Sequence, residues 1–365
     1  MKEKTEKFDV IIIGAGVAGV STAYYLSKIS SGKILIVERE SSFAQHASGK
    51  NAALFRQAAE HLETSSLIQD SLRVFNDPPQ DWAEKSILKK TGSYLIGENK
   101  KLTQLLERLK ALEIKYDIYP HGSFPPNIPN SLKQTLEQSD YETLAYFPED
   151  GVLDIHALMQ NLIHAAKNRK VQFQYQYEVS KIEKTNEGWK ISDTKHSQKT
   201  FQAKVLVNAG GAWASNLVNT FSKQKFQAYR RHLVISNSNP FPRHEISTWP
   251  FVWDISQEYY YRPESNTLLL SPGDEDAFAA IDPPTDPKAI ELLAHKLKKF
   301  SPVLSSLDIM RTWACLRTKS SDGKFKIEFE STIEGLFWVA ALGGHGMSAS
   351  LGVGKKAAKL LAQRT

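Results

Sequence analysis

Three closely spaced glycines near the start of the chain have the spacing of a turn that binds a dinucleotide. Gly14, Gly16 and Gly19 follow the apolar run of residues 8–13 and open a stretch of helical periodicity that begins at Val17 and Ala18. In such a turn the first glycine permits a tight bend, the second lets a pyrophosphate approach the backbone, and the third lets the helix lie close to a sheet. The free N–H groups at the start of the helix would face the anion.

Glu38 supplies the second part of this motif. It follows a second apolar run, residues 33–37, about 20 residues beyond the glycines, where a carboxylate can accept hydrogen bonds from an adenosine ribose. The same charge would repel a 2′-phosphate, which disfavours NADP. The strand, helix and strand around the motif favour a bound ligand over a glycine turn without one, but the motif does not distinguish NAD from FAD.

Three later segments favour the longer of these ligands. Residues 46–53 form a second polar, glycine-containing helix start, residues 205–214 an apolar strand ending in small residues, and residues 343–347 a glycine loop between a strand and a helix. A helix N-terminus at the last loop would stabilise negative charge on a reduced flavin ring. The alternatives are a helix capped by Ser48 and turns that serve packing alone. From these segments we predict as cofactor contacts Arg39, Ser48, Gly49, Asn51, Ala52, Ala209, Gly210, Trp213, Gly343, Gly344, Gly346 and Met347.

Length and composition are typical of a globular protein of two domains. The 365 residues are 41% hydrophobic and 24% charged, and no stretch approaches the roughly 20 apolar residues of a membrane span. Cys315 is the only cysteine, which excludes an intrachain disulfide and a cysteine-rich zinc cluster and favours a reducing, cytoplasmic setting. We expect no metal site. The apolar run of residues 10–20 superficially resembles a signal peptide, but its glycines fit the dinucleotide turn better.

The charge distribution disfavours a nucleic-acid partner. The chain has 46 Lys and Arg against 40 Asp and Glu, a formal net charge of +6, but the basic residues are scattered and acidic residues lie between them. No segment forms a basic arm or stripe, so we expect no DNA partner, and a tRNA partner is disfavoured. The net charge equally suits a small anionic substrate.

Taken as an ordered set, the motifs resemble the FAD-dependent D-amino acid oxidase superfamily, which includes glycine oxidases, sarcosine oxidases and D-amino acid dehydrogenases. The resemblance runs nearly end to end and looks nearest to the bacterial D-arginine and related D-amino acid dehydrogenases. The segments that carry it are the glycine fingerprint with Glu38, ASGKNAA at 47–53, GVLDIHAL at 151–158, VNAGGAWA at 207–214, RRHLVI at 230–235, YYYRPE at 259–264, WACLRTKSSDG at 313–323 and GGHGM at 343–347.

The resemblance implies an α/β fold in which a Rossmann-like FAD-binding domain is interwoven with an α+β substrate domain on a mostly antiparallel sheet. The FAD-binding domain would comprise residues 1–84, 150–222 and 325–365, and the substrate domain residues 85–149 and 223–324. Local patterns agree, because short β-branched and aromatic runs predict strands at 92–97, 227–236, 248–255, 258–263, 266–271 and 311–318. Residues 100–113 and 285–299 have the pattern of amphipathic helices.

The resemblance also suggests the residues that act on the substrate. Arg317 matches the position that holds a substrate carboxylate in similar proteins, and a guanidinium suits this role because it binds carboxylates with two hydrogen bonds. Its alternative is a structural ion pair with Asp308 or Asp322. Strand alternation separates Tyr260 from its tyrosine neighbours, so its hydroxyl could donate to the carboxylate, unless all three tyrosines simply pack. Arg231 and His46 match family positions near the site, with a structural role as the alternative for each. His345 stands where relatives often carry tyrosine and could titrate near neutrality.

Cys315 offers a covalent link to the cofactor. The pattern C-x-R-T-x-x-x-D from Cys315 to Asp322 resembles the sarcosine oxidase segment C-x-Y-T-x-x-x-D, whose cysteine carries the flavin. The alternative, which is the commoner state of a free cysteine, is a small buried hydrophobic side chain beside non-covalent FAD. Leu342 stands where relatives carry glutamine. The lysine that activates oxygen in sarcosine oxidases is missing from residues 268–270, which favours a dehydrogenase over an oxidase.

The resemblance therefore implies an FAD-dependent oxidative deamination. A D-amino acid, or glycine or N-methylglycine, would lose a hydride from Cα to the flavin N5, and the imine would hydrolyse to a keto acid and ammonia. Other functions remain open: a 2-hydroxy acid dehydrogenase, a tRNA-modifying flavoprotein of the same superfamily, or an FAD-binding protein without catalysis. The electron acceptor could be a quinone, another carrier or oxygen.

Overall fold

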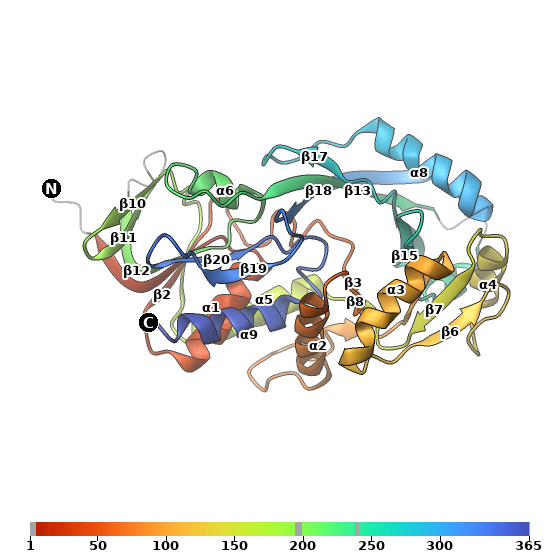
Figure 1. The fold of residues 1–365 in the computed structure, drawn as a ribbon, viewed down its shortest axis with the longest axis horizontal. Helices are drawn as coiled ribbons and strands as arrows, with labels where there is room; N and C mark the ends of the chain where they lie inside the picture. Colours follow the sequence, from red (N-terminus) through yellow and green to blue (C-terminus); the bar gives the residue numbers. More distant parts are fainter. Residues whose placement is uncertain (1–4, 194–198, 238–240, 365) are drawn as a thin grey trace.

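Two large β-sheets lie toward opposite ends of an elongated molecule (Figure 1). The structure is a computed structural model and describes residues 5–193, 199–237 and 241–364. The long antiparallel strands β13 (Gln227–Ser236) and β18 (Ile309–Lys319) run along the top of Figure 1 and reach from the region of the first sheet into the second. The two sheets are therefore joined by regular secondary structure.

The first sheet has eight strands, in the order β10-β11-β12-β1-β2-β9, with β20 paired to β12 and β19 to β20. Strands β20, β12, β1, β2 and β9 are parallel, so their carboxyl ends meet at one edge. The bounds of the strands are β1 Glu6–Ile13, β2 Ile34–Val37, β9 Gln172–Gln174, β10 Lys181–Thr185, β11 Gly188–Ser192, β12 Thr200–Asn208, β19 Lys326–Phe329 and β20 Leu336–Ala340.

Strand β1 is buried on both faces, as expected for the centre of a parallel sheet. Val10 and Ile12 pack against helices α1 (Val17–Ile29), α5 (Ile155–Asn168) and α9 (Ser350–Leu361), whereas Ile11 and Ile13 pack against a cluster on the other face. Helix α2 (Leu62–Asn76) packs against α9, and the short helix α6 (Ala214–Leu217) follows the 3-10 turn η2 (Gly211–Trp213). This arrangement leaves the carboxyl edge of the sheet to the loops.

The second sheet has nine strands, in the order β17-β13-β16-β15-β14-β5-β7-β6, with β18 paired to β13. Every pair except β14 with β5 is antiparallel where its register is resolved, which confirms the expected mostly antiparallel sheet. Besides β13 and β18, its strands are β5 Ser93–Gly97, β6 Asp117–Pro120, β7 Thr143–Phe147, β14 Phe251–Asp254, β15 Tyr259–Glu264, β16 Thr267–Ser271 and β17 Asp276–Phe278. Its helices are α3 Asn99–Leu109, α4 Asn130–Glu137, α7 Arg243–Ile246 and α8 Pro287–Phe300.

A small third sheet lies between the two large ones. It joins β3 (Leu54–Phe55), β8 (Gly151–Leu153) and β4 (Leu88–Lys89), and so combines segments from both predicted domains. The α/β fold class predicted from the sequence is confirmed, while the domain boundaries stay a prediction.

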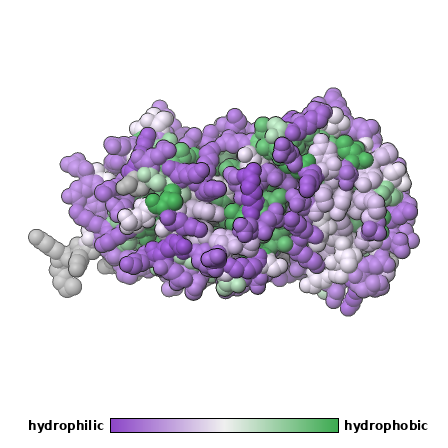
Figure 2. Space-filling model, turned by 90° about the horizontal axis from the view of Figure 1, so that it is seen from below, coloured by the Kyte–Doolittle hydropathy of each residue, from purple (hydrophilic) through white to green (hydrophobic). Residues whose placement is uncertain are grey.

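On the face that Figure 2 shows, hydrophobic residues form small separate patches among hydrophilic ones. None of the helices in the described ranges has the length and apolarity needed to cross a bilayer.

Asp150 links the third sheet to the second. Its carboxylate is fully buried and accepts hydrogen bonds from the Gln57 backbone N–H at 3.0 Å, the Gln57 Nε2 at 2.9 Å and the Ser93 Oγ at 2.6 Å. Burial raises the pKa of Asp150 to about 6, although these hydrogen bonds act in the opposite direction. The carboxyl thus fixes the chain just beyond β3 at the cost of burying an ionisable group.

This raised pKa predicts a pH-dependent contribution to stability. Between about pH 4 and pH 6 the folded chain holds the Asp150 proton and the unfolded chain does not, so the carboxyl destabilises the folded state as the pH rises toward 7. Asp150→Asn removes this effect. Relative to wild type, the variant should gain about 3 kcal/mol of unfolding free energy between pH 4 and pH 7, as measured by urea denaturation. Glu149→Gln, at the less buried neighbour, is the control; parallel curves for wild type and Asp150→Asn would contradict the assignment.

Candidate functional site

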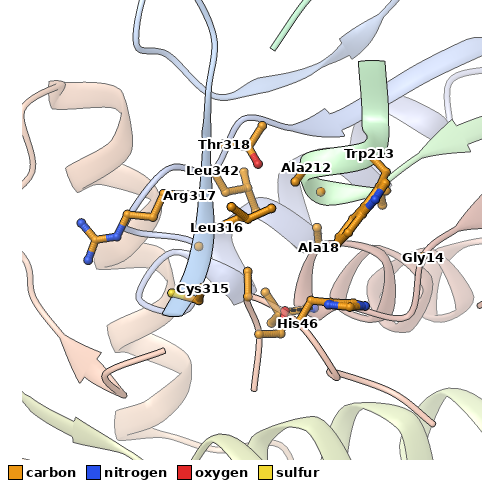
Figure 3. Close-up of a pocket in the computed structure, with 18 of the residues that line it drawn as sticks. Gly14, Ala18, His46, Ala212, Trp213, Cys315, Leu316, Arg317, Thr318 and Leu342 are labelled. Atoms are coloured by element: carbon orange, nitrogen blue, oxygen red, sulfur yellow. Dashed lines mark hydrogen bonds between the residues drawn. The ribbon is translucent and has the colours of Figure 1, made fainter. Parts of the chain in front are cut away.

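A cavity of about 460 Å³ lies at the carboxyl edge of the first sheet and extends to the near end of the second. Loops after β1, β2, β12 and β20 line one part, and residues of β13, β14, β15 and β18 line the other. Figure 3 shows residues of the loops after β1, β2, β12 and β20 together with residues of β18 around this pocket. Open parallel sheets typically bind nucleotides at this edge.

The glycine turn forms the nucleotide end of the cavity. Gly14 has φ of +106°, and a Cβ atom there would lie 2.6 Å from the Ala209 carbonyl oxygen, so only glycine fits. The Ala15 N–H donates to Glu38 Oε2 at 2.8 Å, and the Val17 N–H donates to Ser48 Oγ at 3.0 Å. The turn therefore brings the ends of β1, β2 and β12 together around an open cradle, which fits a bound dinucleotide.

Two predicted cofactor residues do not line the cavity. A Cβ atom on Gly19 would lie 2.1 Å from the Gly14 carbonyl oxygen, and one on Gly49 would lie 2.2 Å from the Ala44 carbonyl oxygen. Both glycines permit close packing of the loops that form the cavity. The predicted residues that line it directly are Gly14, Gly16, Val17, Ala18, Glu38, Arg39, Ser48, Asn51, Ala52, Ala209, Gly210, Trp213, Cys315, Gly343, Gly344, Gly346 and Met347.

His46 lies beside the nucleotide end. Its ring is 4.7 Å from the Trp213 ring, and its Nε2 is 2.9 Å from both Arg39 Nη2 and Glu40 Oε1. The Arg39 guanidinium also stacks over Trp213 at 3.9 Å. In Figure 3 His46 lies on the Trp213 side of the cavity, whereas the Arg317 side chain points to the other side of its strand. The structure therefore does not bring His46 together with Arg317.

Strand pairing places Arg231, Cys315 and Arg317 on one face of the second sheet. Arg231 pairs with Cys315 across β13 and β18, and Arg317 lies two residues further along β18, so the three side chains share a face. Tyr260 lies on this face, while Tyr259 and Tyr261 pack in the core on the opposite face, as the alternation predicted. Leu316 points away from Cys315 and Arg317, toward Ala212 and Trp213 (Figure 3).

Arg317 and Tyr260 are in contact. The Arg317 Nη2 donates to the Tyr260 hydroxyl at 3.5 Å, and a Cβ atom on Gly344 would lie 3.0 Å from Arg317 Nη1. The alternative of a structural ion pair is wrong, because Asp322 pairs with Lys326 at 3.1 Å and Asp308 accepts from Asn237 Nδ2 at 2.7 Å. Within the described ranges, no carboxylate lies within 4.0 Å of the Arg317 guanidinium.

Arg231 brings a second positive charge to this end of the cavity. Its side chain is 4% exposed, Nη2 is 3.9 Å from a Glu275 oxygen, and Nε and Nη1 are buried without a hydrogen-bond partner. Burial lowers the pKa of Arg231 to about 10, with a smaller effect from Arg317, so the group stays charged at neutral pH. A buried guanidinium among the residues that line a cavity adds positive charge there, which favours an anionic ligand.

Two residues of the site were missed by the sequence analysis. Arg56 follows β3 and lines the cavity, and its guanidinium stacks over Trp253 at 3.9 Å. Trp253 in turn stacks on Tyr260, with ring centroids 4.6 Å apart. The sequence predicted that residues 46–53 start a helix, whereas α2 begins only at Leu62. A lone arginine directly after the apolar Leu54–Phe55 pair was the available signal.

The expectation that His345 titrates near neutrality is wrong. Its Nε2 lies 3.1 Å from Arg56 Nη2, and burial together with the nearby Arg56 and Arg317 charges holds the pKa of His345 well below its ordinary value. The imidazole is therefore neutral at pH 7, and its Nε2 accepts the hydrogen bond from the guanidinium. Its role is to hold Arg56 in place.

Burial also bears on the proposed covalent link. Cys315 is 6% exposed, and burial raises the pKa of its thiol even though Arg317 and Arg231 act in the opposite direction. Because the thiolate is the reactive form, this environment favours an unreacted thiol. Among the described residues there is no group of three or more His, Cys, Asp or Glu side chains that could hold a metal ion.

The chain belongs to the family of FAD dependent oxidoreductases, whose pattern it matches over residues 9–360. It is 23% identical to mitochondrial dimethylglycine dehydrogenase of Mus musculus over 97% of this chain and 42% of that protein. It is 25% identical to mitochondrial sarcosine dehydrogenase of Mus musculus, but this match covers 57% of this chain and 23% of that protein. The chain thus spans less than half the length of these relatives. Monomeric sarcosine oxidase of Bacillus sp. is 22% identical over 97% of this chain and 92% of that protein.

Solved structures share the fold. The L-proline dehydrogenase of P. horikoshii superimposes with a TM-score of 0.82 at 19% identity, covering 99% of this chain and 94% of that chain. Glycine oxidase of Geobacillus kaustophilus gives a TM-score of 0.78 at 19% identity, covering 99% and 96%. The glycine cradle at Gly14, the carboxylate at Glu38 and the small residues around Ala209 fit the adenine dinucleotide part of FAD.

The protonated thiol predicts that FAD is held without a covalent bond. When the purified yellow protein is precipitated with acid, we expect the flavin absorbance in the supernatant. Cys315→Ala should bind FAD with a similar dissociation constant, since the side chain is buried and small. A yellow pellet in the wild type that Cys315→Ala abolishes would contradict this expectation.

A neutral His345 predicts that this residue adds no step to the pH dependence of cofactor binding. We expect the FAD dissociation constants of wild type and His345→Gln to keep a constant ratio between pH 6 and pH 8, when apoprotein is titrated with FAD by fluorescence quenching. A ratio that changes with an apparent pKa near 6.5 in this range would show that His345 does become charged.

Proposed function

We propose that the protein oxidises the C–N bond of an amino acid or similar carboxylate-bearing amine. The observation that carries this proposal is the pairing of Arg317 with Tyr260 in a cavity where the Arg317 guanidinium has no carboxylate partner among the described residues. Bidentate binding of a substrate carboxylate by Arg317 would fix its angle as well as its position. Orientation of the reacting carbon is the main catalytic contribution that such a site makes.

Tyr260 and Arg231 complete this binding group. Because the Tyr260 oxygen accepts from Arg317, its own hydrogen is free to be donated to the substrate carboxylate. Arg231 adds its positive charge from the same face of the sheet. Tyr260 is 1% exposed and Trp253 is 9% exposed, so these residues also limit the access of water.

FAD bound in the cavity would supply the acceptor for the hydride from the substrate carbon. The segments around Gly14, Glu38, Asn51 and Gly343 would hold it. The amine would lose a hydride to FAD and a proton to solvent. Water would then convert the imine to a 2-oxo acid and ammonia, or to a 2-oxo acid and an alkylamine when the nitrogen is alkylated. A D-amino acid, glycine or N-methylglycine is the proposed substrate class. The names of the sarcosine and glycine relatives support small or N-methylated amines.

Several finer points belong to the same proposal. The motifs support a position near the D-amino acid dehydrogenases. They do not identify the side chain of the substrate, which depends on the residues that line the pocket. The absence of lysine from Leu268–Leu270 supports a dehydrogenase with an acceptor other than oxygen. A 2-hydroxy acid would use the same carboxylate group and is the second candidate. The expected cytoplasmic location stays a prediction, and the named relatives include mitochondrial proteins.

Anaerobic reduction of the bound flavin tests this function. We expect at least one of D- and L-amino acids, glycine, N-methylglycine and 2-hydroxy acids to bleach the flavin absorbance. Arg317→Lys should lower the reduction rate at low substrate concentration roughly 30- to 100-fold, because lysine cannot make the bidentate contact. Arg311→Lys, at the exposed end of the same strand, is the matched control. The proposal is wrong if no amine bleaches the flavin, or if Arg317→Lys behaves like the control.

A further inference from the structure

Two guanidinium groups in the cavity are connected by a continuous series of contacts. Arg317 Nη2 is 3.5 Å from the Tyr260 hydroxyl. The Tyr260 ring stacks on the Trp253 ring, with centroids 4.6 Å apart, and the Arg56 guanidinium lies 3.9 Å from the centroid of the Trp253 ring. Since Trp253 and Tyr260 pair directly across β14 and β15, the sheet fixes the spacing of the two arginines on this side.

The glycine loop closes the series on the other side. Arg56 Nη2 lies 3.1 Å from His345 Nε2, and the neighbouring Gly344 lies against the Arg317 guanidinium. Arg317 and Arg56 thus contact two consecutive loop residues, Gly344 and His345. Both line the same cavity and stand at two points of a closed ring of contacts.

Arg56 carries a charge that the described protein groups leave without an ion pair. No carboxylate of the described residues lies within 4.0 Å of its guanidinium, which donates a hydrogen bond to the neutral imidazole of His345. The nearby Asp150 is occupied by Gln57 and Ser93. Burial lowers the pKa of Arg56 only to about 10, so the group remains a cation at neutral pH.

The charges at this end of the cavity exceed what one carboxylate can balance. Arg56, Arg231 and Arg317 all line it. Asp274 bonds to His232 at 2.7 Å, and Glu275 lies 2.5 Å from Lys319 against 3.9 Å from Arg231. Glu258, Asp150 and Glu60 act on Arg56 from a greater distance, and none of them forms an ion pair with its guanidinium. Bringing several like charges into a poorly hydrated space is costly unless anions accompany them.

We propose that Arg56 determines specificity by binding a second carboxylate of the substrate. The substrate would be an amino acid whose side chain or nitrogen substituent ends in a carboxylate, with its α-carboxylate on Arg317 and Tyr260 and its distal one on Arg56. The inference rests on the proposed function and narrows its substrate class. It also disfavours cationic side chains such as that of arginine, which Arg56 would repel.

The test compares pairs of probes that differ only in the distal group. Anaerobic flavin reduction is measured with aspartate against asparagine and glutamate against glutamine, in both enantiomers, and with iminodiacetate against N-methylglycine. We expect the wild type to be reduced at least tenfold faster at low concentration by the diacid of at least one pair. Arg56→Met should remove that preference, Arg56→Lys should retain part of it, and Arg108→Met, at an exposed arginine of α3, should leave it unchanged.

A binding measurement separates this inference from turnover. Succinate and its monoamide succinamate are added to the oxidised protein, and the shifts in flavin absorbance and in melting temperature are recorded. We expect succinate to bind at least tenfold more tightly than succinamate in the wild type but not in Arg56→Met.

The outcomes distinguish three cases. If neutral amines bleach the flavin while diacids do not and succinate shows no preference, the proposed function stands and this inference fails. Bleaching by no amine would remove the proposed function, and the inference would fail with it. If Arg56→Met slows both members of every pair by the same factor and shifts the flavin midpoint potential, Arg56 serves the cofactor and the inference is overturned.

Discussion

The close approach of Gly14 to the Ala209 carbonyl is the contact on which the whole site depends. A Cβ atom at residue 14 would lie 2.6 Å from that oxygen, so the carboxyl ends of β1 and β12 can lie side by side only with glycine there. With these ends together, the loop after β2 supplies Glu38 and the loop after β20 supplies residues 343–347. Segments from the beginning, middle and end of the chain therefore converge because parallel strands share one edge.

Electrostatics divides the cavity into two parts. The nucleotide end carries two carboxylates, of which Glu38 accepts from the Ala15 N–H and Glu40 pairs with Arg39 at 2.9 Å. The opposite end holds Arg231 on β13, Arg317 on β18 and Arg56 just after β3, and neither Arg56 nor Arg317 forms an ion pair with a described carboxylate. Such a distribution supports binding of an anionic molecule that lies across the strands of the second sheet, with its reactive carbon presented toward the nucleotide end.

Sequence patterns predicted the fold well, because glycine spacing and strand alternation are local properties. The bounds of β13 agree exactly with the predicted 227–236, and Tyr260 was separated correctly from its neighbours. The chemistry of His345 could not be predicted in this way, since burial in the folded chain lowers its pKa most, and Arg56, which acts in the same direction, lies 289 positions away. Arg56 itself was missed because its surroundings come from Trp253 and His345, which local periodicity cannot bring together.

The β13–β18 ladder has a consequence for how this site can change. Arg231 and Arg317 are locked into a register of paired residues, where inserting or deleting one residue would turn the following side chains to the opposite face. Arg56, by contrast, follows a strand of only two residues and is anchored by its side chain. Under the proposed substrate binding, single replacements at residue 56 would change the preference for the distal group and leave the β13–β18 ladder that holds Arg231 and Arg317 intact.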